Sequence, residues 1–378
     1  MKKVHFTCFI LLFVFYYSFN AQVKGLYVDK FNLILGNVQK EDSLLNYAQG
    51  NGFNYLALYN LWNVHTTSSL TNTVSAQPLA NFINKAKTMF GITAVGATGE
   101  SYWFFSNVIH VYNQQHSNPN HKFDVYNLEF EFWITSSVNS GGIYCTTYLQ
   151  PQGFSCDTSG AFKFYKRELR RMDSLANTIG VISETYIGWP NSGQAKYIAK
   201  SSDRVLVHAY VANESTTYTY TRPRLIDLSG STVPLKFMPI FSAESIFMGP
   251  WSASNQPVQA YNNYALNFAN ETGTWKTNAV LLGYQWFAYS FMPKNSSLSI
   301  QEISNRNESL LFPNPTNGIL YLKENKFKNP TAPVLIYNTL GQIIREMTFS
   351  EKVDMSEFDP GIYYIKTEEK YTRIVLQK

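Results

Sequence analysis

The sequence predicts a (β/α)8 barrel followed by a small all-β sandwich domain. Between residues 23 and 292, eight strand-like segments alternate with helical segments, and this is the pattern and length typical of such a barrel. The polar stretch 293–309 has no periodicity and indicates a linker. In residues 310–378, short strand-like segments separated by turn residues are typical of a β-sandwich.

Residues 1–22 are expected to form a secretory signal peptide. Lys2 and Lys3 supply the positive charge at its start, the apolar run Phe9–Phe15 follows, and cleavage is expected near Ala21. This run is too short to cross a bilayer comfortably, and no other apolar stretch reaches spanning length. We therefore expect an exported chain without an integral membrane segment.

The barrel prediction depends on short apolar strands separated by amphipathic helices. Residues 79–89, 161–178 and 258–268 carry apolar side chains at the three-and-four spacing of a helix that covers a core. An open doubly wound sheet is the main alternative, but the glycine-rich phosphate loop expected after its first strand is missing. The predicted strands are Gly25–Asp29, Tyr55–Tyr59, Thr93–Ala97, Tyr126–Phe132, Gly180–Ile187, Arg204–Tyr210, Leu235–Phe241 and Val280–Phe287.

Charge and motif content argue against several classes of function. The formal net charge is +5, and removing the two lysines of the acid-free signal leaves +3, with the basic residues scattered along the chain. This pattern gives no electrostatic basis for nucleic-acid binding. The sequence also contains no G-x-S-x-G, H-E-x-x-H or P-loop motif, so esterase, zinc protease and nucleotide-binding functions have no support. No cofactor is predicted.

The cysteines indicate an oxidising compartment. Cys8 lies in the signal peptide, which leaves Cys145 and Cys156, eleven residues apart, to form a disulfide in the exported protein. Two cysteines without a nearby histidine do not supply the four ligands of a structural zinc site, so no metal is expected.

The last domain carries a combination of short motifs. These are Pro313–Gly318 (PNPTNG), Ile336–Asn338 with Gly341, Gly361–Tyr363 and a terminal Lys378. Together they resemble the C-terminal type A sorting domain of the type IX secretion system. The resemblance implies a partner, the secretion machinery, and passage across the outer membrane to the medium or the cell surface. The domain then serves as a signal for export and carries no catalytic residue.

Candidate active-site residues follow from the barrel prediction, because such barrels carry their active sites at the carboxyl ends of the strands. Glu100 and Glu184 are interpreted as solvated rim residues, and His208 as structural. Asp29, at the end of the first strand, and Glu244, after the seventh, are expected to contact a substrate. The other polar or aromatic residues at strand ends are Asn60, Asn127, Glu129, Glu131, Tyr210, Gln285 and Trp286.

The fourth strand carries the strongest signal. Because side chains alternate along a strand, Asn127, Glu129 and Glu131 share one face, and the apolar residues between them share the other. The apolar face packs under helices, so the carboxylates point into the barrel. Two carboxylates buried close together raise one pKa, which provides a proton donor near neutral pH.

This strand resembles the D-x-x-D-x-D-x-E signature of glycoside hydrolase family 18, the chitinases and endo-β-N-acetylglucosaminidases. The matching positions are Asp124, Asn127, Glu129 and Glu131, with two of the three aspartates replaced. By this resemblance, Glu131 is the proton donor and Glu129 orients the N-acetyl group of the substrate. Asn127 is then expected among the residues that bind the substrate.

The same resemblance implies two aromatic partners. Tyr210 matches the tyrosine that holds the acetyl group, and Trp286 matches the tryptophan that forms the floor of the sugar site. In that mechanism the acetamido oxygen of the substrate attacks the anomeric carbon while Glu131 protonates the departing oxygen. The function predicted is a secreted glycoside hydrolase acting on N-acetylhexosamine-containing glycans.

Two alternatives stay open. Glu131 as acid/base and Glu244 as nucleophile would match the strand positions of the retaining barrel glycosidases, although Phe130 replaces the asparagine usual before the acid. A secreted glycan-binding or adhesion protein on a degenerate hydrolase barrel is the non-enzymatic alternative. The replaced aspartates favour it, and the retained Glu131 opposes it.

Overall fold

The structure is a computed structural model. It describes residues 22–294, 311–322, 333–338, 342–348, 352–367 and 370–377. The chain divides into two compact units, Met1–Ser297 and Leu298–Lys378, which are taken separately below. The signal peptide, apart from Gln22, and nearly all of the predicted linker lie outside the described residues. In the part of the chain that the structure describes, no helix is long and apolar enough to cross a membrane.

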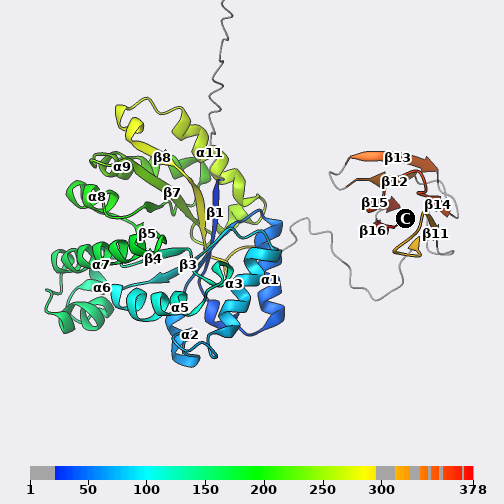
Figure 1. The fold of residues 1–378 in the computed structure, drawn as a ribbon. Helices are drawn as coiled ribbons and strands as arrows, with labels where there is room; N and C mark the ends of the chain where they lie inside the picture. Colours follow the sequence, from blue (N-terminus) through cyan, green and yellow to red (C-terminus); the bar gives the residue numbers. More distant parts are fainter. Residues whose placement is uncertain are drawn as a thin grey trace, which may run out of the picture. The chain divides into compact units, whose positions relative to one another are not determined.

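The first unit is a closed barrel of parallel strands, as the sequence predicts (Figure 1). Its strands pair in chain order, β6 pairs with β7, and β9 lies between β7 and β1, so the sheet closes on itself. Among the described residues, the barrel strands are β1 (Val23–Val28), β2 (Tyr55–Leu58), β3 (Ala94–Gly99), β4 (Val125–Leu128), β5 (Ile182–Ile187), β6 (Arg204–His208), β7 (Leu235–Ser242) and β9 (Gly283–Phe287).

The last strand differs from the prediction, which joined residues 280–287 into one element. The chain forms two strands instead, the short β8 (Ala279–Leu281) beside β7 and then β9 between β7 and β1. Gly283 separates them with a φ of 154°, and its Cα lies so near strand β1 that a Cβ would meet the Val23 carbonyl oxygen at 1.8 Å. Only glycine fits at this crossing.

Helices surround the barrel, and the predicted amphipathic ones are present (Figure 1). The longest, α7, begins where the Asp157 side chain accepts a hydrogen bond from the Gly160 N–H and ends at Gly180 in the left-handed conformation. The helices are α1 (Val38–Gly50), α2 (Leu61–Thr67), α3 (Gln77–Met89), α4 (Tyr102–Phe104), α5 (His110–Gln115), α6 (Thr135–Val138), α7 (Thr158–Ile179), α8 (Ser192–Ala199), α9 (Thr217–Ser229), α10 (Gly249–Ser252) and α11 (Pro257–Ala269).

Two apolar cores follow from the alternation of side chains along the strands. One lies between the strands and the helices and contains residues such as Leu26, Leu128 and Val207. The other fills the barrel lumen, where Tyr27 and Met238 are buried. Because the strands are buried on both faces, almost all of their residues are apolar. The side that faces the lumen is therefore hard to recognise from the sequence.

The base of the lumen holds a buried ion pair. The Arg204 Nε donates to the Glu184 Oε2 at 2.6 Å, and the Tyr55 hydroxyl donates to the other carboxylate oxygen at 2.8 Å. Glu184 is fully buried, so the interpretation of this residue as part of a solvated rim is wrong. Its sequence position at the start of β5, rather than its end, accounts for this placement.

The second unit is built from antiparallel sheets, as predicted. One sheet has the order β10-β11-β14 and the other β13-β12-β15-β16. Buried residues from both sheets, including Leu320 and Ile336, form one small core. Gly341 and Lys378, which carry part of the motif resemblance, lie outside the described residues. The strands are β10 (Leu311–Phe312), β11 (Ile319–Leu322), β12 (Pro333–Tyr337), β13 (Ile343–Thr348), β14 (Lys352–Asp354), β15 (Gly361–Thr367) and β16 (Lys370–Leu376).

Candidate active site

The carboxylates predicted on strand four lie just beyond the end of β4. The prediction extended this strand to Phe132, whereas β4 ends at Leu128. The reason is the length of its neighbour, because β3 ends at Gly99 and the Glu129 N–H makes the last contact with it, donating to the Gly99 oxygen at 2.9 Å. Glu129 and Glu131 therefore belong to the loop at the carboxyl end of the barrel, where barrel enzymes carry their active sites.

Side chains keep their alternation beyond the strand. Leu128, Phe130 and Phe132 are fully or almost fully buried in the layer under the helices. The residues between them, Glu129 and Glu131, are partly exposed to solvent. The apolar residues thus anchor this loop from below and hold both carboxyl groups at the mouth of the lumen.

Glu129 is the more firmly held of the two acids. The Tyr27 hydroxyl, from β1 across the barrel, donates a hydrogen bond to its Oε2. Desolvation and the nearby charge of Glu131 raise the pKa of Glu129 from 4.5 to about 8. At neutral pH its carboxyl group therefore carries a proton for most of the time.

Glu131 is held only by its backbone. Among the described residues, its carboxyl group has no hydrogen-bond or ion-pair partner. Desolvation raises its pKa above the usual range, and the charge of Glu100 raises it further. A carboxyl group that is open to a ligand and holds its proton to higher pH than usual is suited to proton donation.

Glu100, interpreted from the sequence as a solvated rim residue, completes a group of three acids. It follows β3, and its carboxylate accepts hydrogen bonds from the Tyr59 hydroxyl at 3.2 Å and from the Tyr148 hydroxyl. Its charge raises the pKa of Glu131. Its position directly after a barrel strand was the signal that could have found it.

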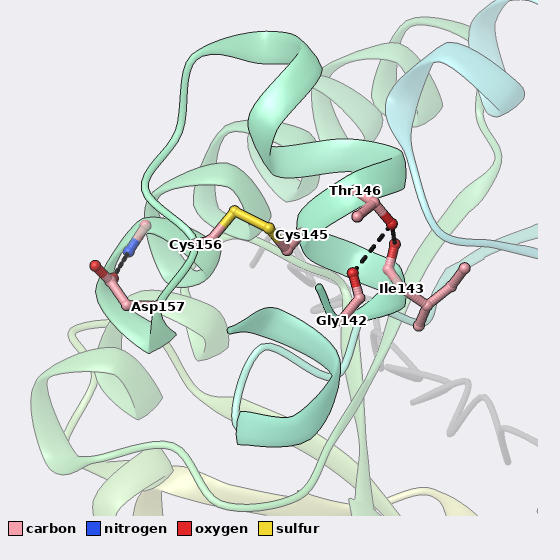
Figure 2. Close-up of a disulfide and its surroundings, with 7 residues drawn as sticks. Gly142, Ile143, Cys145, Thr146, Cys156 and Asp157 are labelled. Atoms are coloured by element: carbon pink, nitrogen blue, oxygen red, sulfur yellow. Dashed lines mark hydrogen bonds between the residues drawn. A yellow bond between two sulfur atoms is a disulfide. The ribbon is translucent and has the colours of Figure 1, made fainter. Parts of the chain in front are cut away.

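The loop that supplies Tyr148 is braced by a disulfide (Figure 2). Cys145 and Cys156 are joined with their Cα atoms 5.1 Å apart. Cys145 begins the short helical turn η4 (Cys145–Leu149), which carries Tyr148. The Thr146 hydroxyl of this turn donates a hydrogen bond to the carbonyl oxygen of Gly142, just before the turn, at 3.1 Å. The covalent link thus restrains a segment that contacts the acid group through Glu100.

Tyr210 lies among the acids and comes after β6, two strands along the barrel from β4. It follows β6, and its pKa is raised strongly by desolvation, by the neighbouring Tyr186 and by the charges of Glu129, Glu244 and Glu131. Its ring stacks on the His208 imidazole at 4.2 Å. Tyr210 is therefore close to both predicted catalytic acids.

Further aromatic side chains lie beside Tyr210 at the mouth of the barrel. Burial and the Arg224 charge lower the pKa of His208 to about 4, so its imidazole is neutral at neutral pH. Trp189 also packs against His208, with ring centroids 4.6 Å apart. Trp133 lies against Gly188, where a Cβ would come within 2.6 Å of its indole nitrogen. This glycine makes room for the tryptophan beside the acids.

Glu244 lies near the same mouth after β7. Its Oε2 accepts a hydrogen bond from the Ser242 hydroxyl at 2.8 Å, and its charge contributes to the raised pKa of Tyr210. Among the described residues, Glu100, Glu129, Glu131 and Glu244 form no ion pair with a lysine or arginine. The mouth of the barrel is therefore acidic.

Two of the predicted substrate contacts, Trp286 and Asn127, are fully buried, and a third, Asp29, is held by a neighbour. Trp286 points outward, is fully buried, donates its indole N–H to the Pro257 oxygen and stacks on Trp251, so its assignment as a sugar platform is wrong. Asp29 accepts hydrogen bonds from both the N–H and the hydroxyl of Ser290, and its contact with a substrate stays a prediction. Asn127 is fully buried below Glu129 and can act on a ligand only through its neighbours.

The Trp286 error has a simple geometric cause. The prediction treated residues 280–287 as one strand and did not determine which of its side chains faced inward. In β9, Gln285 packs near Gly25 within the barrel, and Phe287 belongs to the lumen cluster. The lumen position next to Tyr210 is therefore taken by Phe287, at a ring distance of 5.9 Å.

No metal site accompanies these acids in the described residues, because no group of three His, Cys, Asp or Glu side chains is arranged to hold an ion. The chemistry that the arrangement supports is proton transfer between carboxyl groups and a bound ligand. The aromatic surroundings suit a ligand with apolar faces.

The comparison with protein families identifies the second domain. Residues 310–378 match the family described as secretion system C-terminal sorting domain. This match confirms the resemblance predicted from the motifs of the last domain. The chain is therefore exported, to be secreted or attached to the cell surface. No curated protein sequence matches the chain.

Several solved structures resemble the chain at low identity. A β-glucuronidase from Bacteroides uniformis has a TM-score of 0.43 at 8% identity, over 95% of this chain and 46% of that one. The YdjI aldolase of Escherichia coli K12 has a TM-score of 0.35 at 9% identity, over 71% and 75%. A Group IV chitinase from Ostrinia furnacalis has a TM-score of 0.33 at 11% identity, over 58% and 66%. With TM-scores below 0.5, these likenesses carry no argument about function.

Proposed function

We propose that the barrel is an exported glycoside hydrolase that cleaves N-acetylhexosamine-containing glycans, with Glu131 as the general acid. The observation that carries this proposal is the pair Glu129 and Glu131 at the barrel mouth, both with raised pKa values and without a cationic partner among the described residues. The sorting domain agrees with an enzyme that meets glycans outside the cell.

The two acids differ in a way that favours one assignment. Glu129 is bound by the Tyr27 hydroxyl and lies deeper, whereas the Glu131 carboxyl group has no partner among the described side chains. A proton donor must reach the glycosidic oxygen, so the free group is the better donor. Glu129 and Tyr210 then have the role of holding the acetamido group.

The reaction needs no nucleophile from the protein. The acetamido oxygen forms a bond to the anomeric carbon while the bond from that carbon to the glycosidic oxygen breaks, and Glu131 gives its proton to the departing oxygen. Glu129, in its ionised form, stabilises the positive charge that develops on the acetamido nitrogen. A water molecule then attacks the anomeric carbon as the bond from that carbon to the acetamido oxygen breaks, which restores the acetamido group. Glu131 takes the proton of the water, and the acid is restored.

The test is the turnover of aryl N-acetylglucosaminides and N-acetylglucosamine oligomers by the exported protein. Glu131→Gln keeps the shape of the side chain but has no proton to donate, so turnover should fall by about 10²–10⁴-fold while glycan binding persists. Glu129→Gln should also lower turnover, since glutamine cannot ionise and so never carries the negative charge that the ionised form of Glu129 places beside the acetamido group. Gln49→Glu, at an exposed position in the last turn of α1, is the matched surface control and should leave turnover of the single-sugar substrate unchanged.

Two results would replace this proposal. Glycan binding by the wild type without any cleavage would favour the adhesion alternative. Cleavage of sugars that lack an N-acetyl group, abolished by Glu244→Gln, would favour a retaining mechanism with Glu131 and Glu244. The observation that supports this retaining mechanism as a second candidate is the position of Glu244 near Tyr210.

A further inference from the structure

Two exposed tryptophans lie beside the acid group, outside everything assigned above. The first is Trp62, which is positioned by an unusual backbone turn after β2. Asn60 has a φ of 61°, and its side chain donates a hydrogen bond to the Asp29 carbonyl oxygen at 2.7 Å, which holds the turn. Helix α2 starts next, and its buried Leu61 anchors it while Trp62 projects outward with 48% of its surface exposed.

The second tryptophan, Trp103, follows β3 in the same way. Gly99 ends this strand, and a Cβ there would lie 2.4 Å from the Phe104 ring, so glycine allows the short helix α4 to fold back closely. Phe104 is thereby buried, and Trp103 projects outward with 54% of its surface exposed. The two indoles meet edge to face, with ring centroids 5.9 Å apart.

A cavity of about 450 Å³ opens between these elements. Trp62 and Trp103 line one part, Tyr59 and Tyr148 another, and Asn63 adds an amide at the rim. Indole and phenol rings offer flat apolar faces, and the amide and hydroxyl groups offer hydrogen bonds. This combination matches a pyranose, which has apolar C–H faces and a rim of hydroxyl groups.

The cavity is joined to the acids through Glu100. Its carboxylate lies in the cavity wall and also acts on Glu131 through its charge. Glu100 is the only acidic residue that lines the cavity among the described residues, and no lysine or arginine does so. A sugar bearing a carboxylate or sulfate would be repelled there, because nothing in the wall compensates its charge.

We propose that this cavity binds an uncharged pyranose unit of a chain next to the sugar that is cleaved, so the substrate is a neutral oligosaccharide or polysaccharide. This inference rests on the proposed function, since it names the substrate class of the same site. The protein should therefore recognise several consecutive sugars, with Trp62 and Trp103 holding a unit beyond the reacting bond.

The experiment measures binding and turnover separately on the full exported chain. Calorimetric titration uses N-acetylchitopentaose as the neutral chain and a pentameric oligogalacturonate as the anionic one. Turnover uses an aryl N-acetylglucosaminide, which has no second sugar to occupy the cavity. Trp62→Ala and Trp103→Ala are compared with Trp62→Phe and Trp103→Phe, which keep an aromatic face.

The expected result is a loss of roughly tenfold or more in affinity for the pentamer with each alanine variant, and a loss of less than about threefold with phenylalanine. Turnover of the single-sugar substrate should change by less than about twofold. The oligogalacturonate should bind much more weakly than the neutral pentamer.

Unchanged affinity in both alanine variants, equal affinity for the anionic pentamer, or no binding of the pentamer by the wild type would overturn the inference. These outcomes are distinct from failure of the proposed function. That failure would appear as absent turnover in the wild type or as full turnover in Glu131→Gln.

Discussion

Replacing Glu129 by glutamine should change how the stability of the barrel depends on pH. In the folded protein the pKa of Glu129 is about 8, against 4.5 for a free side chain. Between these pH values the folded chain holds a proton that the unfolded chain has released. The free energy of unfolding therefore falls as the pH rises from about 4.5 to about 8.

The size of this effect follows from the two pKa values. Their difference corresponds to about 5 kcal/mol at most. Glu129 is partly exposed, and solvent screening reduces the figure, so we expect about 2–3 kcal/mol. Glutamine keeps the shape and accepts the hydrogen bond from Tyr27, but it does not titrate. The variant should lose that part of the pH dependence and be more stable than the wild type at pH 8.5.

The assay is urea unfolding of the exported chain at pH 5 and pH 8.5, followed by circular dichroism. The difference between wild type and variant isolates Glu129, because the remaining titrating groups are shared. Glu131→Gln serves as the comparison, with a smaller effect in the same direction. Parallel pH profiles for wild type and Glu129→Gln would refute the reasoning, as would a variant that is less stable at pH 8.5.

Three further predictions concern the framework of the barrel. Replacing Cys145 and Cys156 by serine should lower the free energy of unfolding by about 2–3 kcal/mol, and free-thiol titration of the denatured wild type should find no reactive thiol; two thiols would contradict the disulfide. Arg204→Met should cost about 3–5 kcal/mol in urea unfolding, because it leaves Glu184 buried without its partner; a loss below about 1 kcal/mol would contradict this. Residues 23–300 expressed alone should be soluble and melt cooperatively, and an aggregated or molten product would argue against the domain boundary.

The sequence predicted the fold well because its patterns were local. The α3, α7 and α11 regions show helical periodicity, and their residues form those helices. The motifs after residue 310 predicted the antiparallel second domain and its role as a sorting domain. The end of β4 was less predictable, since it depends on where the neighbouring strand β3 stops rather than on its own residues.

The candidate site was predicted only in part. Glu129 and Glu131 were found because alternation continues past β4, with Phe130 buried between them. Trp286 was misassigned because its orientation depends on the break at Gly283. Glu100 was set aside because its hydrogen bonds come from tyrosines distant in the sequence. Such contacts appear only once the barrel has closed.

The most direct test of the central claim compares leaving groups in Glu131→Gln. An N-acetylglucosaminide of a strongly acidic phenol, such as dinitrophenol, departs without a proton, whereas a sugar or alkyl leaving group needs one. Proton donation by Glu131 predicts that the variant loses about 10²–10⁴-fold in kcat/KM for the sugar leaving group but less than about tenfold for the dinitrophenyl glycoside. An equal loss for both substrates, or no loss for either, would contradict the assignment of Glu131 as the general acid.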